Sequence, residues 1–344
     1  MIVRNEKSRD KVVLPVCFIA LTVFFAIRYY YGLDYGSYLD AFETGATSAR
    51  GGEEEVDPVF YTFMHLFGRF YVFVIVHTLL LFGALFYLTR KYCDHRLYIL
   101  FFLLLLTQNG LIFNMISAMR NALAAIILWV TLDLFYIRKK RWVPFVFGVI
   151  LGSLFHKSAI AFLILPLADF IFIHVKSRVL IIAFLVAAII PMFFANTIFQ
   201  AATNVESFSA YQYYAQSDFT SNINGVFVRA LWLFPTFYII KYSGVFKGKY
   251  QGLYVLSLMF MFIFIINMDW QDRFSTYLKI FWIFALSQVM PKLKFSQKLI
   301  AIVPVLLASG LAFYQFITSM YTEYLTTPGN YLFYQTIFDA PKLP

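Results

Sequence analysis

Long apolar runs alternate with short polar segments along the chain, and most runs are long enough for a helix to cross a bilayer. The pattern predicts an all-α, polytopic transmembrane helical bundle of about eleven spans. The spans 142–156 and 159–174 are short, and they are either tilted or a half-membrane pair that meets at His156. The predicted spans are residues 12–31, 70–89, 97–114, 118–137, 142–156, 159–174, 179–196, 226–240, 250–267, 275–290 and 299–319.

The composition is that of a membrane protein. The 344 residues are 61% hydrophobic and 13% charged, whereas soluble proteins carry about 25% charged residues. No polar stretch is long enough to fold separately, so residues 1–344 are predicted to form a single integral membrane domain. The net charge of +10 would suggest nucleic acid in a soluble protein, but here it reflects topology, and no nucleic-acid partner is expected.

The basic residues follow the positive-inside rule. If the N-terminus is cytoplasmic, four basic residues lie there and fifteen more lie in predicted inner loops, out of 28 in the chain. Most Asp and Glu residues fall in outer loops or at outer helix ends. The odd number of spans then places the C-terminus outside.

Two predicted outer loops are long, at about residues 32–58 and 197–225. The first is acidic and ends near Asp57, after which Pro58 begins an amphipathic stretch that favours an interfacial helix. The second is rich in Tyr, Asn and Gln. Such side chains suit sugar faces and hydroxyls, but they fit an ordinary polar loop equally well.

Cationic side chains also occur at the outer ends of spans, where the positive-inside rule does not require them. Arginines in such places favour a polyanionic ligand at the external face, such as a lipid-linked phosphate or pyrophosphate. These residues are Arg28, Arg120, Arg229 and Arg273, with His156 at a matching depth.

Arg120 and His156 have the most informative surroundings. Arg120 lies in the first turn of its predicted helix, where free N–H groups also favour an anion. The alternative is an arginine that snorkels to the interface. His156 abuts Lys157 and could act as a general base or bind phosphate, although a lone histidine is more often a satisfied core residue.

The other candidates have simple structural alternatives. Asp34 could orient Arg28 or accept a proton from a sugar hydroxyl, or it is a solvated loop acid. Asp272 is a candidate N-cap, and with Arg273 it could form a local surface ion pair. Arg229 is predicted in the first turn of the eighth span.

Common catalytic signatures are missing from the sequence. It has no Walker A, paired-cysteine metal, HExxH or GxSxG motif, and neither a metal ion nor a cofactor is expected. Asp133 and Asp169 lie toward predicted cytoplasmic helix ends, so no carboxylate is expected deep in a span. This argues against a proton-coupled transporter.

Five short motifs occur in order along the chain. They are Arg28 with Gly32-Leu-Asp34-Tyr35 and Tyr38, then Glu55-Val-Asp57-Pro58, Met119-Arg120-Asn121-Ala-Leu-Ala, Phe155-His156-Lys157-Ser158-Ala159 and Arg273-Phe-Ser-Thr-Tyr277. Together they resemble the EpsG/Wzy-type bacterial polysaccharide polymerases, which include O-antigen and exopolysaccharide polymerases. Asn121 departs from the pattern, because glutamine usually follows the arginine; the amide is kept but its reach is shorter.

The resemblance implies a helical fold related to the GT-C glycosyltransferases and O-antigen ligases. It implies polymerisation of undecaprenyl-pyrophosphate-linked oligosaccharide repeat units at the outer face of the bacterial plasma (inner) membrane, with the site facing the periplasm or exterior. Candidate protein partners are a flippase and a chain-length regulator. The implied catalytic residues are His156, Asp34 and Arg120, and the implied substrate-binding residues are Arg28, Arg273, Asn121, Asp57 and Tyr277. Arg229 is a further substrate-binding candidate because of its position, which is similar to that of Arg120.

Two other functions stay open. The chain could be a lipid-linked oligosaccharide flippase or another transporter, although such proteins often show repeated halves and this sequence has no internal repeat. A flippase would also need positive charge along a central cavity, whereas the outer cations share one depth. An O-antigen ligase-like glycosyltransferase is separated poorly from a polymerase by sequence.

Overall fold

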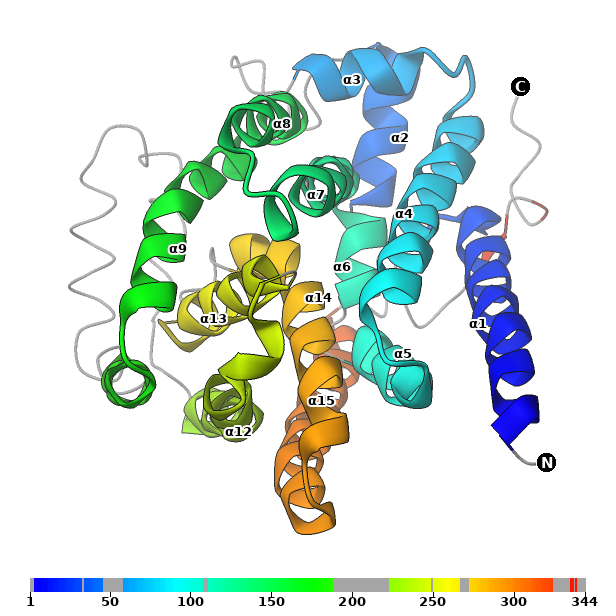
Figure 1. The fold of residues 1–344 in the computed structure, drawn as a ribbon. Helices are drawn as coiled ribbons and strands as arrows, with labels where there is room; N and C mark the ends of the chain where they lie inside the picture. Colours follow the sequence, from blue (N-terminus) through cyan, green and yellow to red (C-terminus); the bar gives the residue numbers. More distant parts are fainter. Residues whose placement is uncertain are drawn as a thin grey trace. The chain divides into compact units, whose positions relative to one another are not determined.

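The computed structural model describes residues 3–32, 34–45, 58–107, 111–187, 223–248, 250–266, 272–323, 335–336 and 338. Helices make up nearly all of this part of the chain, which confirms the all-α prediction (Figure 1). The chain forms two compact units. Unit 1 comprises Met1–Leu163 with Phe313–Pro344, and unit 2 comprises Ile164–Ala312.

Each predicted span overlaps a helix in the part of the chain that the structure describes. Within the described residues, three helical segments are long and apolar enough to cross a membrane: Phe70–Tyr92, Met119–Ile137 and Lys157–His174. A fourth exists if the bent pair His95–Leu106 and Leu111–Ser117 is one span. Within the described residues, the other predicted spans overlap helices that do not meet this criterion. The protein is thus a helical membrane protein, while eleven crossings stay a prediction.

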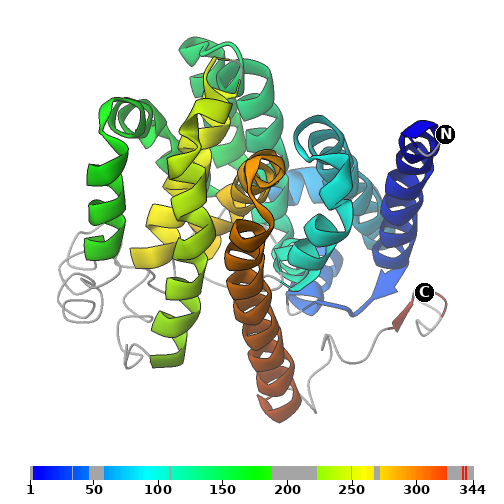
Figure 2. The same ribbon diagram turned by 60° about the horizontal axis from the view of Figure 1, so that its bottom comes forward.

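Unit 1 contains most of the candidate site residues. Its helices are α1 (Val3–Ala26), α2 (Tyr35–Thr44), α3 (Pro58–His65), α4 (Phe70–Tyr92), α5 (Tyr98–Thr107), α6 (Leu111–Ser117), α7 (Met119–Thr131) and α8 (Trp142–Phe155). Short segments add a 3-10 turn at His95–Leu97, a π-helix at Leu132–Ile137 and a 3-10 helix at Lys157–Ile164. The strand β1 (Arg28–Tyr29) pairs antiparallel with β2 (Gln335–Thr336), and Figure 2 shows this pair beyond the end of α1.

Ring contacts show that α1 and α4 are antiparallel. Phe18 of α1 packs edge-on against Phe86 at 5.5 Å, and Phe25, later in α1, stacks on Phe82, earlier in α4, at 5.6 Å. Successive membrane spans must run in opposite directions, so this pairing agrees with the predicted order.

Helices α7 and α8 are also antiparallel, and glycines bring them close together. Gly148 of α8 lies against Thr131 near the end of α7, whereas Gly152, one turn later in α8, lies against Ala124. Small residues at such positions let two helix backbones approach closely in a membrane.

The two ends of unit 1 carry different groups. The end formed by β1, α2, α3 and the first turn of α7 is termed the Arg120 end. The end formed by the last turn of α4 and the segment after α7 is termed the Asp133 end. Helix α4 connects them, and its 23 residues extend about 34 Å, which matches a hydrocarbon core of about 30 Å.

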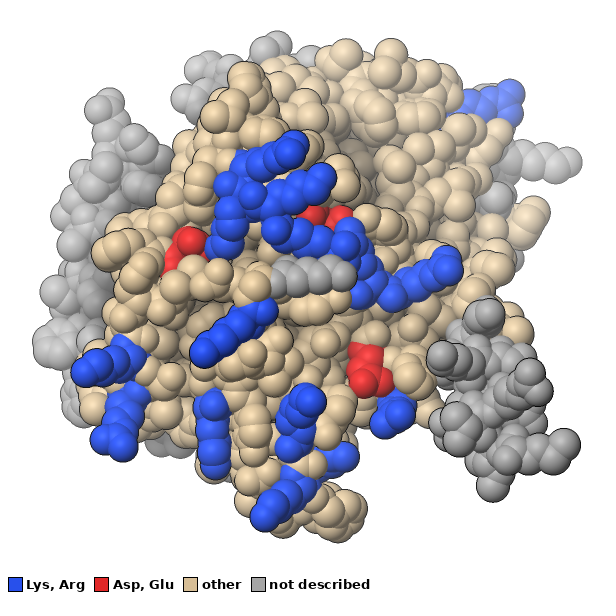
Figure 3. Space-filling view, viewed as in Figure 1, with Lys and Arg blue, Asp and Glu red and all other residues tan. Residues whose placement is uncertain are grey.

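Basic side chains far outnumber acidic ones on the face drawn in Figure 3. In unit 1, the connections that follow α4 and α7 are rich in Lys and Arg. These residues are Arg90, Lys91, Arg96, Arg138, Lys139, Lys140 and Arg141. By the positive-inside rule the Asp133 end is predicted to be cytoplasmic and the Arg120 end external.

Unit 2 has a core of aromatic side chains. Its elements are α9 (Leu165–His174), a helix at Ser177–Ala187, α12 (Ile223–Lys241), 3-10 turns at Ser243–Phe246 and Met290–Lys292, α13 (Gln251–Ile266), α14 (Asp272–Val289) and α15 (Phe295–Glu323), which ends in unit 1. The rings of Trp232 and Trp282 lie 4.6 Å apart, and the Trp282 indole donates to Thr236 Oγ1 at 3.0 Å. This bond satisfies the buried indole N–H and joins α12 to α14.

Candidate functional site

Arg28 is the most deeply buried candidate. The first helix ends at Ala26, five residues before the end of the predicted span, so Arg28 lies in β1 and is fully buried. Its Nη1 donates to Phe25 O at 2.6 Å and to Thr78 Oγ1 at 2.7 Å, and its Nη2 donates to Ile116 O at 3.2 Å. The guanidinium therefore joins α1, α4 and α6 in the interior of unit 1, close to the Arg120 end.

The turn after Arg28 holds Asp34 against the junction of α6 and α7. Gly32 has a φ of +121°, which favours glycine, and a Cβ there would lie 3.4 Å from Ser117 Cα. The Asp34 main-chain N–H donates to Ser117 Oγ at 3.1 Å. The Asp34 carboxylate makes no capping bond to α2 and is only half-buried, so it stands close to the start of α7 within reach of solvent.

Arg120 is the second residue of α7, as predicted, and it is half-buried. Its guanidinium forms a hydrogen bond with the hydroxyl of Tyr38 on α2, and Asp34 and Tyr61 lie close enough to act electrostatically on the same hydroxyl. Burial raises the pKa of Tyr38 to about 12, although the positive Arg120 acts in the opposite direction. Asp34, Tyr38, Tyr61, Ser117 and Arg120 are termed the Arg120 cluster.

Asn121 adds an unused acceptor beside this cluster. Its side chain is 7% exposed, and its Oδ1 has no hydrogen-bond partner among the described residues. A buried polar atom without a partner destabilises a fold by about 1–3 kcal/mol, so such atoms call for a reason. A ligand hydroxyl that donates to Oδ1 would supply one.

His156 marks the junction of two segments, as predicted. It follows α8 with extended backbone (φ −157°, ψ 118°), and the 3-10 helix begins at Lys157. Gly152 lies level with Ala124 of the antiparallel α7, so one further turn places His156 level with Arg120. Both side chains are half-buried. The register therefore brings His156 to the same end of unit 1 as the Arg120 cluster.

The remaining predicted residues are not placed against this cluster. Asp57 lies outside the described residues, as do the side chains of Arg229 and Arg273. Helix α12 begins at Ile223, so Arg229 lies in the second turn rather than the first, and α14 begins at Asp272. Tyr277 belongs to unit 2 and is 1% exposed on α14.

Several buried polar residues were missed by sequence reasoning. Tyr38 stood in a motif without a role, and Tyr61 lay in a stretch assigned only to the interface. His77 and Lys279 are also buried, on α4 and α14. An ionisable residue inside an apolar run was the available signal for both, because such residues are rare in spans and usually have a function.

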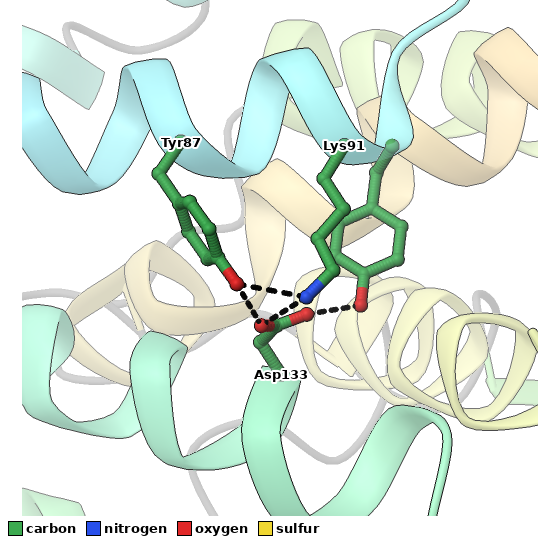
Figure 4. Close-up of polar contacts among 4 residues, drawn as sticks. Tyr87, Lys91 and Asp133 are labelled. Carbon is green, nitrogen blue, oxygen red and sulfur yellow. Dashed lines mark hydrogen bonds and ion pairs between the residues drawn. The ribbon is translucent and has the colours of Figure 1, made fainter.

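Asp133 forms a second polar group at the opposite end. Tyr87 donates to its Oδ2 at 2.8 Å, Lys91 pairs with the same oxygen, and Tyr92 donates to Oδ1 (Figure 4). Asp133 is 1% exposed and lies in the π-helix that follows α7. Asp133 therefore lies near a helix end, as the sequence predicts. Its contacts join α4 to the segment that follows α7, which is a structural role.

No group of three or more His, Cys, Asp or Glu residues that could hold a metal ion occurs within the described ranges. The chemistry of the Arg120 cluster instead matches an anionic ligand. It combines a guanidinium, phenolic hydroxyls and a helix N-terminus, all of which can stabilise negative charge on phosphate oxygens.

Comparison with known proteins identifies a family. A profile of the EpsG family covers residues 11–333 of the 344-residue chain. No curated protein and no solved structure shows significant similarity. The matched range includes all five sequence motifs and confirms the resemblance that they suggested. The chain therefore belongs to the EpsG family.

Proposed function

We propose that this protein polymerises undecaprenyl-pyrophosphate-linked oligosaccharide repeat units by glycosyl transfer at the outer face of the bacterial plasma membrane. Family membership implies a membrane protein with a polysaccharide polymerase-type role. The observation that supports the finer proposal is the Arg120 cluster, in which a guanidinium at a helix N-terminus meets Tyr38 and lies near Asp34.

The proposed reaction breaks one bond and forms one. The hydroxyl oxygen of the acceptor sugar attacks the anomeric carbon of the donor, and the bond between that carbon and the pyrophosphate oxygen breaks. The electron pair leaves with the pyrophosphate, where Arg120 and the N–H groups of the first turn of α7 stabilise the charge. The hydroxyl proton passes to Asp34 or His156 as the base.

The other residues have supporting roles in this proposal. Asn121 accepts a hydrogen bond from a sugar hydroxyl. Arg28 is fully buried, so its role is indirect: it holds α1, α4 and α6 in place near the Arg120 cluster. The further substrate contacts rest on the sequence alone, either on a motif or, for Arg229, on the predicted place at an outer span end. They are Arg229, Arg273, Asp57 and Tyr277.

A deletion strain tests the function against its alternatives. The lipid-linked glycans of the strain are extracted and sized, and accessibility to an added glycosidase reports the membrane face. A polymerase predicts single repeat units on the carrier at the outer face. Repeat units held at the inner face would indicate a flippase instead, and normal polymer that fails to reach its final acceptor would indicate a ligase.

Arg120 variants test the site. Arg120→Ala should abolish long polymer, and Arg120→Lys should restore only part of it because an ammonium lacks the planar fork of a guanidinium. Loss of a buried charged contact costs about 2–5 kcal/mol, or roughly 30- to several-thousand-fold in rate if the contact forms in the transition state. Arg69→Ala is the matched control, because Arg69 is an exposed arginine before α4. Wild-type chain length in Arg120→Ala, at equal expression, would remove Arg120 from the site.

The base is assigned by comparing two variants. Asp34→Asn and His156→Gln keep approximate shape and remove the proton acceptor. The residue that acts as base should lose most of the activity, whereas a residue that orients substrate should lose less. Equal and modest losses in both would contradict a single base at this position.

A further inference from the structure

Arg120 occupies an electrostatically unfavourable position. The N-terminus of a helix carries partial positive charge, so a cation in the first turn of α7 is repelled unless another group holds it. The N-cap residue Ala118 offers no side-chain acceptor. The phenolic oxygen of Tyr38, which shares a hydrogen bond with the guanidinium, is an acceptor from outside the helix.

Tyr38 is itself held rigidly. Its side chain is 3% exposed, its ring lies 5.3 Å from that of Phe60 on α3, and its N–H donates to Asp34 O at 3.1 Å. Asp34 in turn donates its N–H to Ser117 Oγ, beside the start of α7. The hydroxyl of Tyr38 is therefore fixed relative to the helix that carries Arg120.

We propose that Tyr38 is a positioning residue that sets the direction of the Arg120 guanidinium for the leaving pyrophosphate. This inference rests on the proposed function. A guanidinium has five N–H donors in a fixed plane, so one hydrogen bond to a rigid phenol restricts the orientation of the rest. Tyr38 thereby reduces the side-chain entropy that Arg120 would otherwise lose on binding its ligand.

The protonation state of Tyr38 supports this role. Because burial raises the pKa of its hydroxyl to about 12, Tyr38 stays neutral under physiological conditions. A neutral phenol accepts a hydrogen bond from Arg120 without neutralising its charge. Tyr38 therefore orients the guanidinium without adding a negative charge beside it.

Purified protein with a synthetic lipid-pyrophosphate-linked repeat unit tests the proposal. Tyr38→Phe keeps the ring and its packing on Phe60 and removes only the hydroxyl. We expect the turnover number to fall about 10- to 100-fold, as for loss of a hydrogen bond to a charged group, with little change in melting temperature. Tyr254→Phe, which removes a buried hydroxyl from unit 2, is the control and should keep wild-type turnover.

A double-mutant cycle separates positioning from an independent effect. In the Arg120→Lys background, Tyr38→Phe should cause less than about a twofold further loss, because the group that it positions is gone. A wild-type turnover number in Tyr38→Phe, or an equal loss in both backgrounds, would overturn the inference. If Arg120→Ala retains full activity, the proposed function of the cluster fails instead.

Discussion

Gly148→Ala should displace α8 from α7. The displacement should move His156, which follows α8, relative to Arg120 at the start of α7. An alanine Cβ at position 148 would lie 2.2 Å from Thr131 Oγ1, 2.3 Å from Thr131 Cγ2 and 2.8 Å from Thr131 Cβ. Real Cβ atoms essentially never approach other heavy atoms this closely. Thr131 is buried and β-branched, so its side chain has few other rotamers in a helix with which to avoid the clash.

The expected cost follows from overpacking. Extra methyl groups in a packed core usually destabilise by about 1–3 kcal/mol, and the overlap at this site places Gly148→Ala at the upper end. For a domain of the size of unit 1, this corresponds to a fall of about 5–10 °C in melting temperature. Separation of the helices should also reduce polymer synthesis, because His156 directly follows the end of α8, eight residues after Gly148.

Two glycine controls make the test specific. Gly83→Ala in α4 places its Cβ where no atom lies within 4 Å, so it should be neutral or stabilise by up to about 1 kcal/mol. Gly152→Ala meets Ala124 O and Leu128 Cγ at 3.5 Å, an ordinary contact, and should be tolerated. Adding Thr131→Ala to Gly148→Ala should recover part of the loss, since only the 2.8 Å contact then remains.

Melting temperature in detergent and glycan chain length in cells measure the two effects. The reasoning is refuted if Gly148→Ala melts with the wild type and makes normal polymer. It is also refuted if Gly83→Ala is as damaging, because the loss would then follow from any alanine in these helices and not from the approach of α7 and α8.

The fold was largely predictable because hydrophobic period and loop charge are local signals. The helix that begins at Pro58, the first-turn position of Arg120 and the junction at His156 all match the sequence prediction. The end of the first helix did not match. The helix ends at Ala26, and Tyr30 and Gly32 adopt positive φ and turn the chain, so Arg28 lies in a buried strand after the helix and not within a span that runs to residue 31.

The candidate site was predictable only in part because it depends on pairs that are distant in sequence. Tyr38 and Arg120 meet because α2 docks on the junction of α6 and α7, and no periodicity within either segment specifies that contact. The same holds for Asp133, whose partners lie on α4. The hydrophobic pattern predicts how far along a helix each of these residues lies. It does not predict which residue of another helix each one contacts.

Three further predictions concern the same elements. Asp133→Asn should destabilise the protein by about 3–5 kcal/mol by leaving the charge of Lys91 without its buried partner, seen as a lower melting temperature that Lys91→Met partly restores. Above pH 10 the unfolded protein loses the Tyr38 proton before the folded protein does, because burial raises the folded pKa of Tyr38 to about 12. Wild type should therefore lose stability relative to Tyr38→Phe as the pH rises from about 10 to 12, and parallel melting curves across that range would contradict this. The last prediction tests topology: β2 pairs with β1 at the Arg120 end, so the exposed Phe338 lies at that end and Lys139 lies at the other. In a background without Cys17 and Cys93, Phe338→Cys should react with an impermeant maleimide in intact cells, and Lys139→Cys should react only after permeabilisation. The reverse pattern would place the Arg120 cluster on the cytoplasmic face, where an outer-face polymerase cannot use it.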